Sequence, residues 1–421
     1  QQRIFLTSVI KAIFNSGYDP KSLSNSKTGV FGAVSTRDYH ELSILYKSKI
    51  EPHFSTGLAH SILANRVSYF LNLKGPSEVV DTACSSSLVA LNRAVNSIIT
   101  GECDQAIVGG VNLNLSPLTF LAFESTGILS EYSRCKSFDK DAAGYARGEG
   151  VASMIIKPVI KAIKDGDHIH AVIKGTSVNH GGHGQSLTAP SQVRQAEVIK
   201  DAVLQSGCAP ESISYIEAHG TGTALGDPIE ISGILKAFKL SEEAKKTFRC
   251  GIGSVKSNIG HLEAAAGMAG IMKVILAMKN KTIPKSLHIQ ELNPFIKLKN
   301  SGFYIAQQTH EWKGNDGESL KAGVSSFGFG GTNAHVILES HSQKSTKEKE
   351  KEKETMVLPF SAPSKEQLDE YLNDIKKYLK STTYPLHDIA YTLQYGREVH
   401  DHRIAFLGNT KQVIIEQVEN Y

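Results

Sequence analysis

Short apolar segments alternate with helical patterns through the first 340 residues of the chain. Five segments rich in Val and Ile are typical of strands, namely 106–113, 151–159, 169–178, 213–220 and 335–340. Residues 87–100 and 261–280 repeat apolar positions at helical spacing, and the second is rich in Ala and Gly, which favours a helix packed closely on all sides. This alternation predicts an α/β fold in which layers of helices bury a sheet.

The composition changes sharply after residue 340, where HSQKSTKEKEKEKET occupies 341–355. Alternating Lys and Glu cannot bury an apolar face, so we interpret 341–356 as a solvated linker, with a single charged helix as the alternative. From 357 onward a globular pattern returns. Apolar residues recur at helical spacing from Leu368 to Leu379, Ser364 and Gln367 form a capping box, and 403–408 reads as a strand. We therefore predict a small α/β unit at 357–421.

Composition and charge exclude several classes of function. The 421 residues carry a net charge of only +4, and no basic stripe with interleaved aromatics predicts nucleic-acid binding. No apolar run is long enough to span a membrane, and the N-terminus lacks the layout of a signal peptide. The odd number of cysteines, five, rules out a fully paired set of intramolecular disulfides, and the lack of a CxxC pair disfavours zinc binding. We therefore expect a cytoplasmic protein.

Cys84 is the first candidate for chemistry. It lies in EVVDTACSSSLVALNRAV, between an extended apolar segment and an amphipathic helix. Thiols at helix N-termini titrate at about 3.5–7.5 because the helix dipole favours the thiolate. The turn also resembles a nucleophile elbow. A buried structural cysteine is the alternative that this local pattern leaves open.

Two histidines and a lysine follow predicted loops. His219 lies in EAHGTGTALGDPIE, whose glycines let the backbone approach a ligand and whose Asp227 is expected to cap the next helix. His261 stands at the entry of the Ala-rich helix, and Lys256 precedes it in a Gly/Ser/Asn loop. Lys256 is a candidate for setting the charge of His261, and Glu263 either offsets that lysine or is simply a first-turn acid. A turn with a satisfied histidine remains the alternative for His219.

The loop FGFGGTN at 327–333 is unusually rich in Gly and Phe. Its N–H groups could point at an oxyanion, whereas a phosphate loop is disfavoured because no GK[ST] follows. A tight turn packed by two aromatics is the remaining interpretation. GHGQ at 182–185 is interpreted only as a loop.

Four segments in this order are more specific than any one of them: DTACSSS (81–87), EAHGTGTALGDPIE (217–230), KSNIGHLEAAAG (256–267) and SSFGFGGTNAH (325–335). Together they resemble β-ketoacyl synthases, most closely the ketosynthase domains of bacterial modular polyketide synthases. RCKSFDKDAAGYARGEG at 134–150 is a fifth similar segment. The resemblance covers residues 1–340, and residues from 357 resemble part of the linker domain that follows ketosynthases.

The resemblance implies a thiolase-like layered α-β-α-β-α fold made of two similar halves, usually as a homodimer. It assigns the nucleophile to Cys84 and the paired catalytic histidines to His219 and His261. Lys256 matches the family's lysine beside the second histidine. QQRIFL at the start resembles the interior of a family segment, so the N-terminal part of the family's domain is expected to be missing, and such a fragment would not necessarily fold alone.

Further positions follow from the same resemblance. Thr221 and Thr223 match threonines that line the phosphopantetheine arm of an acyl carrier protein. Phe329 matches the gatekeeping aromatic, whose backbone N–H forms an oxyanion hole with that of Cys84. The implied activity is decarboxylative Claisen condensation in polyketide chain elongation, with no metal or redox cofactor and with phosphopantetheine carried by the partner. A separate acyltransferase is a possible further partner, since no GHSxG motif occurs.

Three other functions are weighed against elongation. A non-elongating transacylase of the same fold is disfavoured because both histidines are present. A thiolase-type enzyme acting on acyl-CoA would usually carry a second cysteine near the C-terminal glycine loop, where this chain has Asn333. The intact Cys-His-His set argues against a catalytically silent docking module, an alternative that the missing N-terminal part keeps open.

Overall fold

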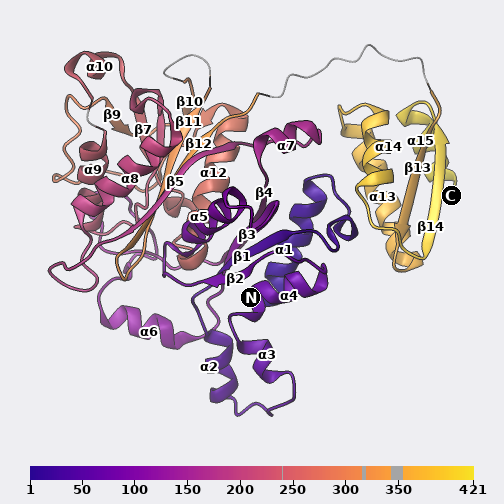
Figure 1. The fold of residues 1–421 in the computed structure, drawn as a ribbon, viewed down its shortest axis with the longest axis horizontal. Helices are drawn as coiled ribbons and strands as arrows, with labels where there is room; N and C mark the ends of the chain where they lie inside the picture. Colours follow the sequence, from indigo (N-terminus) through magenta and orange to yellow (C-terminus); the bar gives the residue numbers. More distant parts are fainter. Residues whose placement is uncertain (239, 315–318, 343–353) are drawn as a thin grey trace. The chain divides into compact units, whose positions relative to one another are not determined.

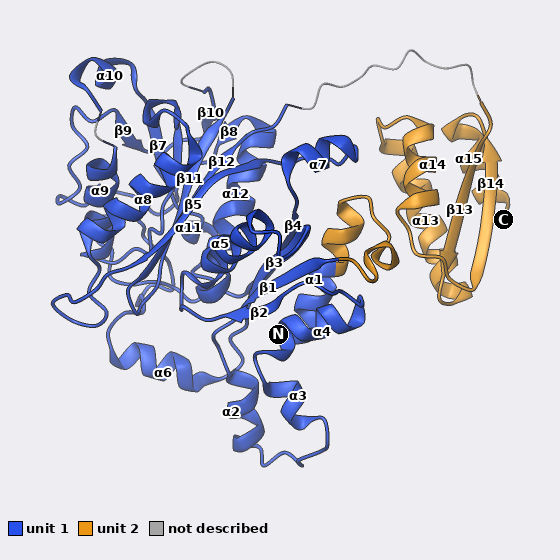
Figure 2. Cartoon of the chain, viewed as in Figure 1, with its two compact units in different colours: residues 1–9, 27–342 blue, residues 10–26, 343–421 orange. Residues whose placement is uncertain are grey.

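The computed structural model describes residues 1–238, 240–314, 319–342 and 354–421 (Figure 1). These residues form two compact units, 1–9 with 27–342 and 10–26 with 343–421 (Figure 2). Of the linker predicted at 341–356, residues 343–353 lie outside the described residues. None of the helices formed by the described residues has the length and apolar character needed to cross a bilayer.

The first sheet of the larger unit has four strands in the order β2 (Ser77–Val80), β1 (Thr28–Ala33), β3 (Gln105–Asn112) and β4 (Gly150–Ile156). The strands are parallel except β4, which runs antiparallel to β3. Every residue of β1 is buried, as expected for a strand covered on both faces. The predicted strands at 106–113 and 151–159 are thus confirmed as β3 and β4.

The second sheet has six strands, in the order β5 (Val172–His180), β12 (Thr332–Glu339), β11 (Lys321–Phe327), β6 (Tyr215–Glu217), β7 (Cys250–Gly253) and β9 (Phe303–Ile305). Strands β11, β6, β7 and β9 are parallel, and β12 is antiparallel to both of its neighbours. A separate antiparallel pair joins β8 (Thr282–Ile283) to β10 (His310–Glu311).

Helices α5 (Ser86–Ile99) and α12 (Ala266–Asn280) lie between the two sheets (Figure 1). The amide of Met268 donates to Ser87 Oγ at 3.1 Å, and a Cβ at Gly267 would lie 2.5 Å from Leu88 Cγ, so only glycine permits this close approach of the helices. The first six residues of α12 are buried, in agreement with the close packing predicted, whereas Leu276 near its end is 57% exposed.

Outer helices complete the layers. Helices α8 (Gln192–Ser206) and α9 (Gly226–Ala237) cover the other face of the six-stranded sheet, and α4 (Ile62–Phe70) packs on β1 and β2. The result is the predicted α-β-α-β-α arrangement. The remaining helices of this unit are α1 (Gln2–Asn15), which continues into the second unit, α2 (Asp38–Leu45), α3 (Phe54–Leu58), α6 (Pro117–Ser125), α7 (Val159–Lys164), α10 (Glu242–Thr247) and α11 (Lys256–Ile259).

The second unit contains an antiparallel pair, β13 (Met356–Ala362) and β14 (His402–Gly408), with helices α13 (Lys365–Ser381), α14 (Leu386–Tyr395) and α15 (Lys411–Asn420). Ser364 Oγ accepts the amide N–H of Gln367 at 3.3 Å, so the predicted cap at the start of α13 forms. A core that includes Leu358, Phe360 and Leu372 is buried between these elements. Helix α15 and the inclusion of residues 10–26 were not predicted from the sequence pattern.

We predict that Gly175→Ala destabilises the larger unit. A Cβ at this position of β5 would lie 2.3 Å from the carbonyl oxygen of Ala202 and 2.8 Å from the amide nitrogen of Ser206, both in α8. Backbone atoms cannot rotate away, so strand and helix must separate, and the unfolding free energy measured in urea should fall by about 1–3 kcal/mol. Gly57→Ala is the control, because a Cβ there meets nothing within 4 Å. Equal losses in both variants would contradict the prediction.

Candidate active site

The predicted site residues lie on loops that follow strands. Cys84 comes after β2, His219 after β6, His261 after β7 and Phe329 between β11 and β12. Because β6, β7 and β11 are parallel, their carboxyl ends meet at one edge of the sheet, where ligands usually bind in such folds. The topology therefore brings these separate motifs together.

The turn that carries Cys84 has the geometry of a nucleophile elbow. Ala83 adopts a left-handed conformation with φ +54°, which is strained for a residue with a side chain, and α5 begins two residues after Cys84. Ser86 Oγ accepts the amide N–H of Thr82 at 2.9 Å and donates to the carbonyl of Ala83 at 2.5 Å. Ser326 of β11 donates to the carbonyl of Cys84 at 2.6 Å, which fixes the turn to the larger sheet.

The loop between β11 and β12 presses against this turn. A Cβ at Gly328 would lie 2.4 Å from the carbonyl oxygen of Thr82, so a side chain there would push the loop away. The backbone N–H of Phe329 hydrogen-bonds the Cys84 sulfur and lowers the thiol pKa. The Phe329 ring is 45% exposed and packs edge-on against Phe123 at 6.4 Å between centroids. One loop thus supplies both an amide at the sulfur and an aromatic side chain at the cavity.

Burial nevertheless raises the pKa of the Cys84 thiol to about 11, and the negative charge of Glu263 raises it further, while the Lys256 ammonium group opposes the shift. The expectation of a lowered thiol pKa from the helix N-terminus is therefore wrong for the unliganded protein. The thiolate loses more solvation energy in this enclosed position than the helix end returns.

A buried carboxylate shapes the backbone at His219. Glu230 accepts the N–H groups of His219 and Gly220 at 2.7 and 2.8 Å. Gly220 and Gly222 have φ of +43° and +82°, and a Cβ on Gly220 would lie 2.8 Å from the side chain of Ser254. The glycines are therefore required by the turn. Nδ1 of His219 has no hydrogen-bond partner among the described residues.

His261 is held by its backbone and by one ring nitrogen. Its N–H donates to the carbonyl of Ala146 at 2.7 Å, and its Nδ1 accepts the N–H of Glu263 at 3.0 Å. In the neutral ring the hydrogen must then sit on Nε2, which is buried and without a partner among the described residues. His261 thus presents an unused donor. The helix predicted from residue 261 in fact begins at Ala266, after a 3-10 turn over Glu263–Ala265.

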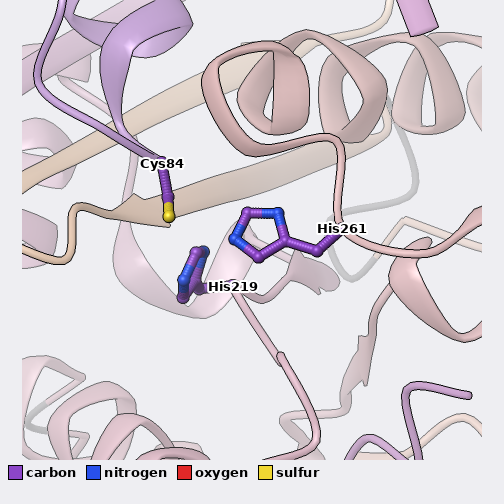
Figure 3. Close-up of side chains that lie close together, drawn as sticks. All are labelled: Cys84, His219 and His261. Carbon is purple, nitrogen blue, oxygen red and sulfur yellow. The ribbon is translucent and has the colours of Figure 1, made fainter. Parts of the chain in front are cut away.

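The three side chains point toward one another (Figure 3). The Cys84 sulfur and one ring nitrogen from each of His219 and His261 lie within 4.8 Å of one another, and the two rings are 5.4 Å apart between centroids. Such spacing could suit a metal ion, but the hydrogen on Nε2 of His261 removes one of the lone pairs that an ion would need. Burial and the Lys256 charge hold the pKa of both histidines well below its usual value, so both rings are neutral near pH 7.

The charge of Lys256 influences the pKa values of Cys84, His219 and His261. Lys256 opens α11, is 4% exposed, and does not line the cavity that contains Cys84. Burial lowers the pKa of its ammonium group, whereas Glu217 and Glu230 raise it. Glu263 does not offset this lysine, since it forms a two-bond ion pair with Arg147 at 2.6 and 3.1 Å. The suggested pairing of Glu263 with Lys256 is therefore wrong.

A cavity of about 800 Å³ opens over the group. Its walls include Cys84, His219, His261, Thr221, Thr223 and Phe329. The hydroxyl oxygens of Thr221 and Thr223 are 3.4 Å apart. All the site residues predicted from the sequence, except Lys256, thus face one cavity.

Buried carboxylates of the site were missed or misassigned from the sequence. Asp227 was expected to cap α9, but that helix begins at Gly226, and the carboxylate accepts the N–H groups of Gly222 and Phe138 at 3.1 and 2.7 Å. Burial raises the pKa of Asp227 to about 6 and that of Glu230 to about 7. Acidic residues directly beside apolar ones, as in YIEAHG and DPIE, were the available signal.

Comparison with known proteins agrees with this geometry. The family models "Beta-ketoacyl synthase, N-terminal domain" and "Beta-ketoacyl synthase, C-terminal domain" match residues 1–162 and 170–290, and "Ketoacyl-synthetase C-terminal extension" matches 293–406. Polyketide synthase PksN of Bacillus subtilis (strain 168) is 44% identical over 436 residues, covering 100% of this chain and 8% of that protein. Polyketide synthase ThaG of Burkholderia thailandensis is 42% identical, covering 96% and 7%. The chain thus spans less than a tenth of these relatives.

Solved structures give the same result. The ketosynthase from module 6 of the bacillaene synthase of Bacillus subtilis 168 superposes with a TM-score of 0.89 at 38% identity, covering 100% of this chain and 70% of that one. The oxazolomycin ketosynthase domain OzmH KS7 of Streptomyces albus JA3453 gives 0.92 at 36% identity, covering 100% and 73%. This chain therefore belongs to the β-ketoacyl synthase family, as a ketosynthase domain of the polyketide synthase type followed by the family's C-terminal extension.

Proposed function

We propose that this domain extends a polyketide chain by decarboxylative Claisen condensation. The observation that carries the proposal is the convergence in one cavity of the Cys84 thiol with two neutral histidines, the half-buried His219 and the fully buried His261. A thiol suits covalent capture of an acyl group, and two neutral imidazoles suit the stabilisation of an oxyanion.

In the first stage, the Cys84 sulfur attacks the thioester carbonyl of an acyl chain on a carrier protein. The thiol is protonated in the unliganded site, so its proton must leave during attack, and it ends on the departing carrier thiol. The backbone N–H groups of Cys84 and Phe329 stabilise the tetrahedral oxygen. Donors of this kind each contribute about 3–4 kcal/mol in related sites.

In the second stage, a malonyl-type extender on a carrier protein loses carbon dioxide and leaves an enolate. The Nε2 hydrogen of His261 and a ring N–H of His219 donate to the enolate oxygen. The enolate carbon attacks the acyl-Cys84 carbonyl and forms the new C–C bond. Cys84 leaves as the thiolate and takes up one proton from solvent, so the atoms and charges balance.

The partners in this proposal are acyl carrier proteins, a second copy of the domain and a separate acyltransferase that loads the extender. In this proposal Thr221 and Thr223 line the phosphopantetheine arm, and the presence of both residues in the wall of the cavity that contains Cys84 supports this role. The arm belongs to the carrier protein, and the reaction as written uses no metal or redox cofactor. A transacylase that accepts acyl groups without condensing them is the alternative, and the intact histidine pair favours elongation.

Cys84→Ala should abolish acylation, because it removes the attacking sulfur. Intact-mass spectrometry after addition of an acyl thioester measures the mass gain, and Cys208→Ala should keep it as a matched control. Persistent acylation of the Cys84→Ala protein would contradict the nucleophile assignment.

His219→Ala should leave acylation in place and lower elongation by about 10²–10³-fold, because one oxyanion donor is lost. Formation of β-ketoacyl carrier from malonyl carrier measures elongation, and the exposed His53 provides the control substitution. Wild-type acylation without any extended product, given suitable carriers and chains, would instead support the transacylase.

Alkylation of Cys84 by iodoacetamide should keep rising with pH beyond pH 9. The thiol pKa of about 11 means that the thiolate fraction grows about tenfold per pH unit below that value. Peptide mass spectrometry follows Cys84 and Cys208 separately. A plateau of the Cys84 rate near neutral pH would show that the thiol ionises more easily than its burial implies.

A further inference from the structure

Glu217 is a buried carboxylate that the proposed chemistry does not use. It is the last residue of β6, two positions before His219, and it is 1% exposed. Its Oε1 accepts the N–H of Val255 at 2.6 Å. Its Oε2 accepts the Tyr215 hydroxyl at 2.8 Å and lies 2.7 Å from Lys273 Nζ.

These contacts join three elements behind the cavity. Tyr215 and Glu217 belong to β6, Lys273 belongs to α12, and Val255 immediately precedes Lys256 at the start of α11. The bond from Val255 therefore fixes the backbone at the point from which the Lys256 side chain departs. This carboxylate therefore fixes that segment relative to β6, together with the bonds from the Ala218 N–H to the Gly253 carbonyl at 2.8 Å and from Ser254 Oγ to the Gly220 carbonyl at 2.9 Å.

Lys256 needs a negative charge nearby because it is almost fully buried. In the described part of the chain it forms no ion pair, so the charges that stabilise it act over a longer distance. Two carboxylates raise the pKa of Lys256, and the effect of Glu217 is larger than that of Glu230. Glu230 also accepts two backbone N–H groups, and burial raises its pKa to about 7. Of the two carboxylates, Glu217 is the one that also binds the backbone next to Lys256, through the N–H of Val255.

We propose that Glu217 is a positioning residue of the site, which anchors the Val255–Lys256 segment and supplies the charge that keeps Lys256 an ammonium ion. In turn, the Lys256 charge keeps His219 and His261 neutral and favours the Cys84 thiolate. The importance of this role for catalysis rests on the condensation proposed above. The titratable groups coupled to the Lys256 charge are Glu217, Glu230, Asp227, Cys84, Cys135, His219 and His261. The groups in contact with the Glu217 carboxylate include Lys273 and Tyr215.

The test is the rate at which iodoacetamide alkylates Cys84 at pH 9, a readout that needs neither carrier protein nor condensation. Glu217→Gln keeps the shape but removes the charge, so Lys256 loses its proton more easily and the Cys84 thiolate becomes rarer. We expect the rate to fall by about threefold or more. Tyr215→Phe is the matched control, since it removes one hydrogen bond to the same carboxylate and leaves the charge, and its rate should stay near that of the wild type.

Two further variants separate this effect from structural damage. Lys273→Met leaves the Glu217 charge less neutralised, so alkylation should stay equal or become faster, opposite to Glu217→Gln. In the Lys256→Met background, Glu217→Gln should change the rate by less than about 1.5-fold, because the group through which it acts is gone. Circular dichroism on heating identifies any variant that fails to fold, in which case the Lys273→Met result decides.

The outcomes are distinct. A Glu217→Gln rate equal to that of the wild type, an equal further loss in the Lys256→Met background, or slower alkylation in Lys273→Met would overturn the positioning role. Elongation by the wild type tests the proposed function separately. If the wild type acylates but does not elongate, the condensation proposal fails while the alkylation results still stand.

Discussion

The site depends on the burial of one cation, Lys256, inside the layer of polar groups behind the cysteine and the histidines. An ammonium ion in a poorly solvated interior is stable only beside negative charge, and here β6 and α9 provide it through Glu217 and Glu230. The same positive charge disfavours protonation of His219 and His261. Two neutral rings can therefore stand 5.4 Å apart, facing a thiol, without repelling one another as cations would.

The backbone conformation of three turns positions the side chains of the site. Each reactive group follows the carboxyl end of a strand, and each turn is bent by a constrained conformation, at Ala83, Gly220 or Glu263, all with positive φ. The strain at Ala83 and Glu263 is held by contacts from outside the turn. Ser326 binds the Cys84 carbonyl, and Arg147 binds the Glu263 carboxylate. The two sheets and the helices between them thus hold groups that are distant in sequence.

The apolar pattern predicted the strands and central helices because burial on both faces leaves near-continuous runs of Val and Ile, as in β3. The motifs likewise indicated Cys84, His219 and His261. The pairing and solvation of the ionisable residues could not be predicted in the same way. Whether Glu263 pairs with Lys256 or Arg147, and whether Cys84 is solvated, depends on contacts between residues more than a hundred positions apart. The capping role expected of Asp227 also failed because of a distant contact, since the N–H of Phe138, 89 positions away, donates to its carboxylate.

The loop after β11 combines two roles in four residues. Gly328 lies against the Thr82 carbonyl, the Phe329 amide reaches the sulfur, and the Phe329 ring stands partly exposed at the cavity. In the proposed condensation, access of the acyl chain past the Phe329 ring and stabilisation of the oxyanion by the Phe329 amide are therefore mechanically coupled. On that proposal, lengthening or loosening this loop to admit a bulkier chain would also move the amide away from the reacting carbonyl. The proposal thus favours trimming the Phe329 ring, with the backbone of residues 328–331 left untouched, when broader substrates are sought.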